Sequence, residues 1–290
     1  MPPIRLIRRR IRSVQSISKI TRAMEMVAAS RMRRAQERGL MGRPYEEKLR
    51  QVLGDLAAVP HPGEEDGAFH PLLARRPQVR KVEIIHITSD RGLCGALNAN
   101  ANRRLAAFIL QSPAPVTTIS IGKKGRDFLV RTGQDLRAEF TGLGDKPGLL
   151  DIIPAARIAM DDFTQGLVDM VYLSYPRFIS TMTQRPVIEQ LLPVEPAELP
   201  PGQNVDYIFE PNPHQVLDML LPRYVEMEVY HALLETLASE QSARMVAMRN
   251  ATDNANELTQ DLTLAYNKAR QEMITKELLD MMGTKVALGE

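Results

Sequence analysis

Cysteine is nearly absent from this 290-residue chain, and long apolar runs are missing. The only cysteine, Cys94, cannot form a disulfide within the chain, which favours a reducing compartment. No apolar run reaches the roughly 18 residues that a membrane-spanning helix needs, and no secretory signal core is present. These absences exclude an internal disulfide framework and a helical membrane span within this sequence.

The usual nucleotide-binding and nucleophile signatures are also missing, although "ITSDRGLCGALNAN" (87–100) comes close to them. A phosphate-binding P-loop needs G-x-x-x-x-G-K-[ST] and a dinucleotide-binding turn needs G-x-G-x-x-G, but this segment offers only Gly92 and Gly95. A Cys-x5-Arg phosphatase site fails because Asn100 stands six residues after Cys94. No residues have zinc-ligand spacing, and no carboxylate pair stands out for acid–base catalysis. The sequence therefore predicts no catalytic residue, no cofactor and no metal.

Cys94 still leaves one enzymatic alternative open. An arginine at position 91 and the start of a helix would both favour the reactive thiolate. A nucleophile also needs an oriented base, and only His86 is near in sequence. A structural cysteine is the favoured interpretation, and the alternative is a stand-alone α/β hydrolase or phosphatase that uses Cys94.

Charge is divided unevenly along the chain. Residues 1–50 hold 14 Lys and Arg against 4 Asp and Glu, a net charge of +10, whereas the other 240 residues hold 23 against 31, a net charge of −8. Such a basic end suggests nucleic acid, an anionic surface or an acidic protein partner. A coiled-coil nucleic-acid binder is a third interpretation, although no aromatic residues interleave with the basic ones.

Both ends of the chain carry helical apolar spacing. The N-terminal stripe runs through Ile4, Ile7, Ile11, Val14, Ile17, Ile20, Met24 and Val27, and helix-forming residues continue to about Ala58. We expect Pro44 to kink or interrupt that helix. From Arg223 to about Met282 there is no proline, and a matching stripe includes Tyr224, Met227, His231, Leu234, Ala238, Met245, Met248, Ala255, Leu258, Leu262, Ala269 and Met273.

The middle of the chain alternates strands with helices. Strands are expected at 79–89, 116–122, 137–143, 170–178, 186–194 and 205–209, and helices at 97–111, 123–132 and 149–166. A C-terminal helix of about 90 Å exceeds a domain roughly 40 Å across, so it must project and pair with the N-terminal helix. The expected fold is a Rossmann-like α/β domain (78–210) with a long antiparallel coiled coil from the terminal helices (1–58 and 214–285).

Three stretches resemble the gamma subunit of F-type ATP synthases. They are "KITRAMEMVAASRMRRAQ" (19–36), "TSDRGLCGALN" (88–98) and "LASEQSARMVAMRNATDNANELTQDLTLAYNKARQEMITKEL" (237–278). The resemblance covers nearly the whole chain and implies a non-catalytic central rotor stalk. The expected partners are the alpha and beta subunits of an alpha3-beta3 hexamer, the epsilon subunit and the membrane-embedded c-ring, with proton flow coupled to ATP synthesis or hydrolysis.

The same resemblance assigns contacts residue by residue. By position, those expected to face the hexamer are Met24, Arg91, Arg244, Arg270, Gln271, Thr275 and Glu277. Those expected at the foot, toward the c-ring and epsilon, are Tyr207 and Glu210. Because the motif begins almost at Met1, the Arg-rich start is interpreted as shaft and not as a transit peptide. A peripheral location on the cytoplasmic face of a bacterial cell membrane is expected.

Overall fold

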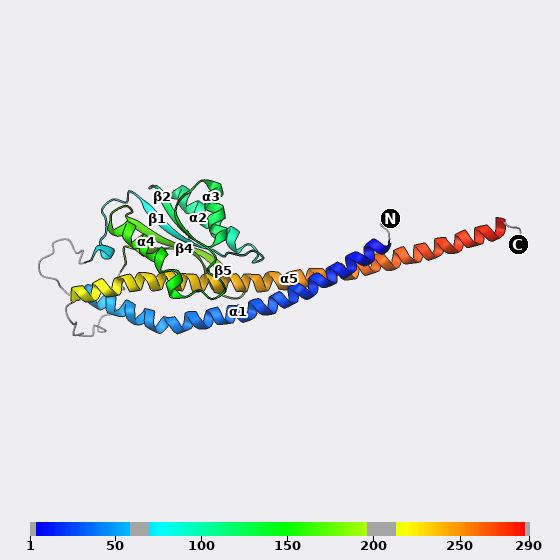
Figure 1. The fold of residues 1–290 in the computed structure, drawn as a ribbon, viewed down its shortest axis with the longest axis horizontal. Coiled ribbons are helices and arrows are strands. Elements are labelled where there is room, and N and C mark those ends of the chain that lie inside the picture. The colour runs from blue at the N-terminus through cyan, green and yellow to red at the C-terminus, as the bar shows by residue number, and fades with distance from the viewer. Residues whose placement is uncertain (1–3, 59–69, 196–212, 288–290) are drawn as a thin grey trace. The chain divides into compact units, whose positions relative to one another are not determined.

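The computed structural model describes residues 4–58, 70–195 and 213–287. Its elements follow in this order: α1 (Ile4–Ala58), η1 (Pro71–Leu73), β1 (Val82–Ile87), α2 (Leu97–Gln111), β2 (Val116–Ile121), α3 (Lys123–Thr132), β3 (Asp135–Phe140), η2 (Leu149–Asp151), α4 (Ile153–Thr164), β4 (Met170–Phe178), β5 (Gln184–Leu192) and α5 (Pro213–Ala287) (Figure 1). Residue contacts divide the chain into two compact units. Unit 1 comprises 1–28 and 244–290, and unit 2 comprises 29–243, so each contains part of α1 and part of α5.

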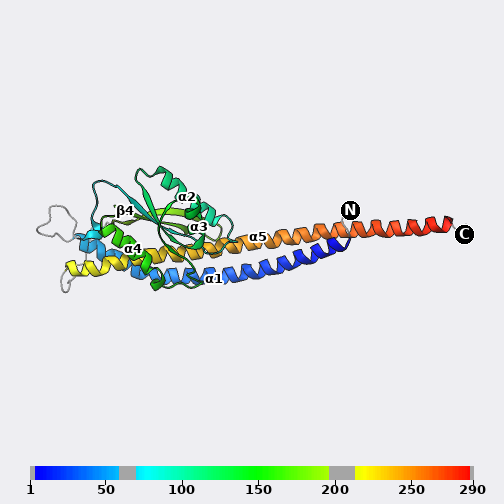
Figure 2. The ribbon, with the colours of Figure 1, turned by 45° about the horizontal axis from the view of Figure 1, so that its top comes forward.

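Unit 2 is built on a five-stranded sheet in the order β3-β2-β1-β4-β5. β1 pairs in parallel with both β2 and β4, β2 pairs in parallel with β3, and β5 is antiparallel to β4. Apolar residues of α2 and α3 pack on one face of the sheet, and those of α4 and the unit 2 part of α5 pack on the other (Figures 1 and 2). This arrangement confirms the expected Rossmann-like α/β domain with a largely parallel sheet.

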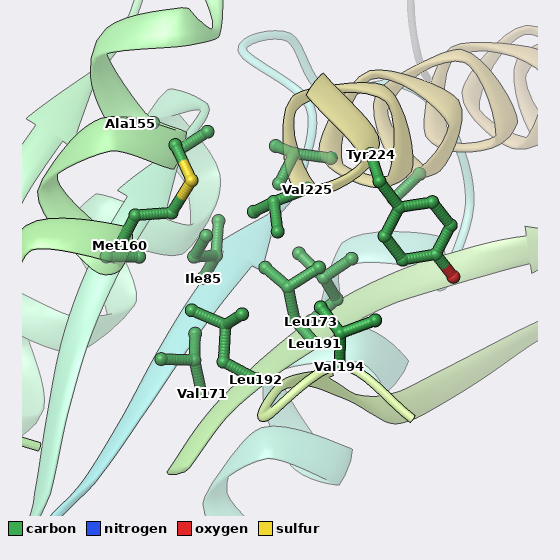
Figure 3. Close-up of a cluster of buried hydrophobic side chains, with 14 of the residues drawn as sticks. Ile85, Ala155, Met160, Val171, Leu173, Leu191, Leu192, Val194, Tyr224 and Val225 are labelled. Atoms are coloured by element: carbon green, nitrogen blue, oxygen red, sulfur yellow. The ribbon is translucent and has the colours of Figure 1, made fainter. Parts of the chain in front are cut away.

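The larger core lies between the sheet and α4, α5 and the end of α1. Figure 3 shows side chains from β1, β4 and β5, among them Ile85, Val171 and Leu173, meeting Met160 of α4 and Val225 of α5. The branched residues of the central strands are buried on both faces, as parallel strands covered by helices require. The sheet and these two helices are therefore held together mainly by apolar packing.

The boundaries of three elements agree with the expected ones. α2, α3 and β4 begin and end at the expected residues. The third strand lies two or three residues earlier than expected, and beyond its end the backbone N–H of Gly142 donates to the side chain of Asp90 and not to a neighbouring strand. The helix expected over 149–166 is split into η2 and α4, and the strand expected at 205–209 lies outside the described residues.

Proline does not interrupt either long helix. α1 runs through Pro44 and α5 runs through Pro222. Of the kink or interruption expected at Pro44, the interruption is therefore wrong, and the kink stays a prediction. Each proline removes one backbone hydrogen bond, which is a local cost. Leu49 and Leu53 of α1 and Leu221 of α5 are buried in the larger core next to these positions. Helices in proteins gain most of their stability from such tertiary packing, and here it outweighs the single lost bond.

Unit 1 is a pair of helical segments joined side to side. The Ser18 hydroxyl donates to Asn256 Oδ1 over 2.7 Å, the Thr21 and Thr252 hydroxyl oxygens lie 2.6 Å apart, and Arg249 Nε donates to Glu25 Oε1 over 2.9 Å. As the residue number rises along α1, the number of its partner on α5 falls. The two segments are therefore antiparallel, which confirms the expected antiparallel pairing.

Candidate functional site

The turn between β1 and α2 holds Cys94 as a packed side chain. Cys94 is 2% exposed, and the Asn98 side-chain amide donates a hydrogen bond to its Sγ over 3.2 Å. The thiol lies 4.0 Å from the backbone carbonyl oxygen of Arg91. Leu93 and Gly95 have φ angles of 63° and 58°, so the backbone turns through left-handed conformations that fold the thiol inward. This placement agrees with the structural interpretation of Cys94.

The histidine nearest to Cys94 in sequence is engaged elsewhere. His86 is fully buried on β1, with Nδ1 3.0 Å from Ser174 Oγ and Nε2 3.0 Å from Asn102 Oδ1. Burial lowers the pKa of His86 to about 4, so the ring is neutral near neutral pH. Since both ring nitrogens already have hydrogen-bond partners, His86 is not placed to activate Cys94. The hydrolase alternative therefore lacks its base.

Arg91 has an acidic partner within unit 2. Its Nη1 lies 3.5 Å from Asp145 Oδ1, and the same oxygen accepts a hydrogen bond from Arg31 Nη1 over 2.8 Å. The turn that carries Asp145 is fixed at its base by Asp90, whose Oδ2 accepts the N–H of Gly142 over 3.0 Å. One aspartate thus joins α1 to the turn after β1. The Arg91 side chain remains 68% exposed, so other groups can still reach it.

Four predicted contact residues lie on the C-terminal part of α5. Arg270, Gln271, Thr275 and Glu277 are all exposed, and the Thr275 hydroxyl donates to the Gln271 carbonyl oxygen over 2.9 Å. Every described side chain from 270 to 282 is exposed. Large apolar residues are among them, namely Met273, Ile274, Leu278, Leu279, Met281 and Met282. An exposed apolar segment of this kind is typical of a surface that a partner covers.

The remaining predicted contact residues differ in their surroundings. Met24, on the α1 segment of unit 1, is half-buried, which leaves part of its side chain accessible. Arg244 is only 8% exposed, unlike the four residues further along α5. Tyr207 and Glu210 lie outside the described residues. The four residues from Arg270 to Glu277 thus lie exposed on neighbouring turns of α5. Arg244 lies further back on the same helix and is buried.

From residue 17 onward, the seam of the helix pair is displaced by one position from most of the expected stripe. The α1 residues that face α5 include Ser18, Thr21 and Ala28, whereas Ile17, Ile20 and Val27 are 48%, 59% and 51% exposed. The stripe was expected to continue through the apolar residues, and for these three residues that was wrong. Alternate steps of three and four from Ile4 lead to 7, 11, 14, 18, 21, 25 and 28, so strict heptad counting finds the seam where apolarity does not.

A row of apolar side chains therefore points away from the seam of unit 1. Ile17, Ile20 and Val27 follow one another at intervals of three and seven residues, which places them on one side of the helix. The basic side chains that precede these residues or lie between them are exposed as well, namely Arg8, Arg9, Arg10, Arg12, Lys19 and Arg22. Sequence reasoning assigned these apolar residues to the seam and so missed them as surface residues.

Unit 2 contains a cavity of about 500 Å³ lined by β4, β5, α1 and α5. Four of its charged lining residues form two ion pairs, Arg50 with Glu228 at 3.4 Å and Arg177 with Glu189. Cys94 does not line it, so the thiol and this cavity are separate. In the described part of the chain, no cluster of three or more His, Cys, Asp or Glu side chains is arranged to hold a metal ion. None of the described helices is long and apolar enough to cross a membrane.

Comparison with known sequences places this architecture in a family. The sequence profile of the ATP synthase family, described as "ATP synthase", matches residues 3–288. The ATP synthase gamma chain of Dehalococcoides mccartyi is 60% identical over 288 residues, covering 99% of this chain and 100% of that protein. The ATP synthase gamma chain of Roseiflexus castenholzii is 52% identical over 294 residues, covering 100% of both chains.

Comparison with solved structures gives the same fold. The central stalk and c-ring structure of the Tetrahymena thermophila mitochondrial ATP synthase contains a chain with a TM-score of 0.59 and 27% identity, covering 80% of this chain and 99% of that one. The rotor of the Euglena gracilis mitochondrial ATP synthase contains a chain with a TM-score of 0.66 and 22% identity, covering 93% of this chain and 98% of that one. At that identity, the second likeness supports the fold alone.

Proposed function

Because the chain belongs to the gamma chains of the ATP synthase family, we propose that it turns as the central stalk of an F-type enzyme and couples proton flow to ATP synthesis or hydrolysis. A gamma chain is a non-catalytic subunit, so its function is mechanical. It acts by changing which conformations its partners populate as it turns. The observation that carries the proposal is the exposed apolar end of α5, from Met273 to Met282.

The proposed hexamer contacts lie on the helix pair and on the turn after β1. We assign Met24, Arg91, Arg244, Arg270, Gln271, Thr275 and Glu277 to the alpha3-beta3 hexamer, and Tyr207 and Glu210 to the c-ring and the epsilon subunit. Arg270 and Gln271 are exposed hydrogen-bond donors suited to carboxylates of a beta subunit. Arg91 is exposed enough to meet a partner beside Asp145, whereas Arg244 would have to leave its buried position.

The exposed basic side chains of α1 support the choice of an acidic partner. Residues 1–50 carry a net charge of +10, and the basic residues from Arg8 to Arg22 face solvent on unit 1. Complementary charge guides association and favours the correct partner. We further propose a peripheral location on the cytoplasmic face of a bacterial membrane, and a division of the chain into 1–58, 78–210 and 214–285.

Copurification tests the proposal most directly. A tagged form of the chain, expressed in its source cell, should copurify with alpha and beta subunits in the ratio of one to three to three. Native mass spectrometry of the purified complex measures that ratio. Recovery of the chain only as a free monomer or as a homo-oligomer would contradict the stalk assignment.

Met24→Lys tests the coupling contact within the assembled complex. The new cation adds an attraction to an acidic beta-subunit loop, which each rotation step has to break. We expect ATP hydrolysis to stay near normal while ATP-driven proton pumping per ATP falls several-fold, measured together on inverted vesicles. Leu110→Lys, at an exposed apolar position of α2, is the matched control and should leave that ratio unchanged. An unchanged ratio in both variants would remove the role assigned to Met24.

Cys94→Ser separates the stalk from the hydrolase alternative. The stalk assignment predicts near-normal hydrolysis by a complex that contains the variant, because Cys94 only packs within its turn. Loss of turnover with the subunit still assembled would favour catalysis by the thiol.

A further inference from the structure

Five charged side chains lie around the amino ends of the parallel strands in unit 2. Glu83 is the second residue of β1, Asp135 and Arg137 begin β3, and Lys81 precedes β1. Asp162 comes from the last turn of α4, which crosses the same end of the sheet. Glu83 shares a face of β1 with residues of the larger core, since side chains alternate along a strand.

Two of the three acids in this cluster have cationic partners. Arg137 Nε and Nη2 donate to the two oxygens of Asp162 over 2.9 and 3.1 Å, a forked pairing. Lys81 Nζ lies 3.7 Å from Asp135 Oδ2, which also accepts a hydrogen bond from the Thr117 hydroxyl over 2.8 Å. Both cations of the cluster are therefore already matched with an acid.

Glu83 is the acid left over. Its side chain is fully buried, and neither carboxyl oxygen has a hydrogen-bond partner among the described residues. The neighbouring strand β4 offers no cation at this level, because Val171 stands opposite Glu83. The nearby Asp169, just before β4, already has partners, namely Arg76 at 3.4 Å and the backbone N–H groups of residues 80 and 81.

An ionised Glu83 would place a third negative charge beside two cations, on a side chain that solvent does not reach. Burying such a charge without a partner is far more costly than burying the neutral acid. Burial, reinforced by the negative charge of Asp162 and opposed by Arg137 and Lys81, raises the pKa of Glu83 to about 7. The neutral form balances the cluster, with two acids against two bases.

We propose that Glu83 is a proton-binding switch that holds β3 and α4 in place when protonated and loosens them when it ionises. On ionisation the carboxyl proton passes to solvent, and the new carboxylate competes with Asp162 for the guanidinium of Arg137. That guanidinium is one link between the edge strand β3 and α4. The inference concerns the α/β sheet alone and does not depend on the stalk function.

The direction of the pH effect follows from proton binding in the two states. The pKa of Glu83 is about 7 in the folded chain and about 4.5 when the residue is exposed. Between these values the folded state holds a proton that the unfolded state has released, so stability falls as pH rises. The stability that proton binding at Glu83 adds to the fold is fully present below pH 4.5 and is lost above pH 7.

The test compares the full-length chain with Glu83→Gln, which keeps the side-chain shape and cannot ionise. Between pH 5 and 7, the stability advantage of wild type over Glu83→Gln should fall, with the ratio of their unfolding constants changing about tenfold per pH unit in urea titrations. Glu139→Gln, at an exposed carboxylate of β3, is the matched control and should run parallel to wild type. Parallel curves for wild type and Glu83→Gln would overturn the proposal.

A direct measurement keeps the proposal testable even when Glu83→Gln does not fold. Infrared difference spectra of the wild-type chain should contain the band of one buried protonated carboxyl at pH 6 that disappears by pH 9. Asp162→Asn removes the neighbouring charge and frees Arg137, so it should move the disappearance of this band to lower pH. Absence of the band at pH 6, or the same midpoint in Asp162→Asn, would show that Glu83 is not the proton site.

Discussion

The helix pair of unit 1 and the sheet of unit 2 are stabilised in different ways. Unit 2 buries branched aliphatic and aromatic side chains on both faces of its sheet, with Phe163 fully enclosed. Unit 1 buries threonine, alanine and methionine along a narrow seam, among them Thr21, Thr252 and Ala28. The sheet gains its stability from apolar area, whereas the seam gains alignment from matched polar groups at some cost in stability.

The polar groups of the seam can be matched in only one alignment. Three pairs cross it in succession, a serine with an asparagine, a threonine with a threonine, and a glutamate with an arginine. Sliding one helix by a turn would leave each buried hydroxyl without its partner. Polar side chains in coiled coils are known to fix register in this way. Unit 1 is therefore specific in register and weak in apolar burial.

Removing a core aromatic from unit 2 should produce the largest effect. Phe163→Ala takes a fully buried ring out of the α4 layer and should lower the free energy of unfolding by about 3–5 kcal/mol. Urea titration of the full-length chain, with hydrogen exchange at β1 and β2, measures the change. Leu110→Ala, at an exposed position of α2, should stay within about 0.5 kcal/mol. A loss of about 1 kcal/mol or less for Phe163→Ala would contradict the account of an apolar core.

Protonation of His86 should have the next largest effect. The pKa of His86 is about 4 in the folded chain and about 6.5 in the exposed state, so the unfolded state binds the proton first as pH falls. Stability present above pH 6.5 should be lost down to pH 4, by at most about 3 kcal/mol. The advantage of wild type over His86→Gln should shrink across that range in urea titrations. A ring that protonates near pH 6.5 in NMR titration of the folded chain would contradict the prediction.

The threonine pair of unit 1 should contribute less than either change in unit 2. The Thr21 and Thr252 hydroxyls contact each other, and each also contacts a backbone carbonyl oxygen, that of Ser18 for Thr21 and that of Met248 for Thr252. Two hydroxyl protons therefore serve three contacts. Thr21→Val should cost about 1 kcal/mol, and adding Thr252→Val should recover most of it, because both partners are then apolar. Local opening free energies from hydrogen exchange at 14–28 and 248–259 measure both values. A double variant twice as destabilised as the single one would mean that the hydroxyls do not act as a pair.

The surface ion pair of unit 1 should contribute least. Glu25→Gln breaks the contact with Arg249, whose side chain is 61% exposed, and should change local opening by about 0.5 kcal/mol or less. The same hydrogen-exchange experiment at low and high salt checks it, because screening should erase the difference. An effect larger than that of Thr21→Val would reverse the order of polar contributions in the seam.

Local patterns in the sequence predict the sheet and its helices well. β4 was found to the residue because its strand-forming residues follow Asp169, and α3 because Gly122 and Gly133 lie at its two ends. Proline was misleading at Pro44, since no local rule shows that residues on either side of it pack into a core. Tertiary packing decided that point.

The seam and the buried charges were harder to predict. Apolarity favoured Ile17 and Ile20 over Ser18 and Thr21, although strict heptad spacing from Ile4 passes through the two polar residues. Glu83 in a strand resembles any exposed glutamate until β3 and α4 are placed around it. The contact residues of α5 came from the resemblance to the family, and their partners belong to other chains.

His86 and Glu83 lie on opposite faces of β1, and their pH effects have opposite signs. Between about pH 4.5 and 6.5, unfolding releases one proton at Glu83 and takes one up at His86. The net proton exchange of this pair is then zero, so together they add no slope to the stability of the sheet in that range. Because the two effects cancel, this pair on β1 leaves the free energy of unfolding constant with pH in that range. Either residue alone would make the free energy of unfolding change with pH.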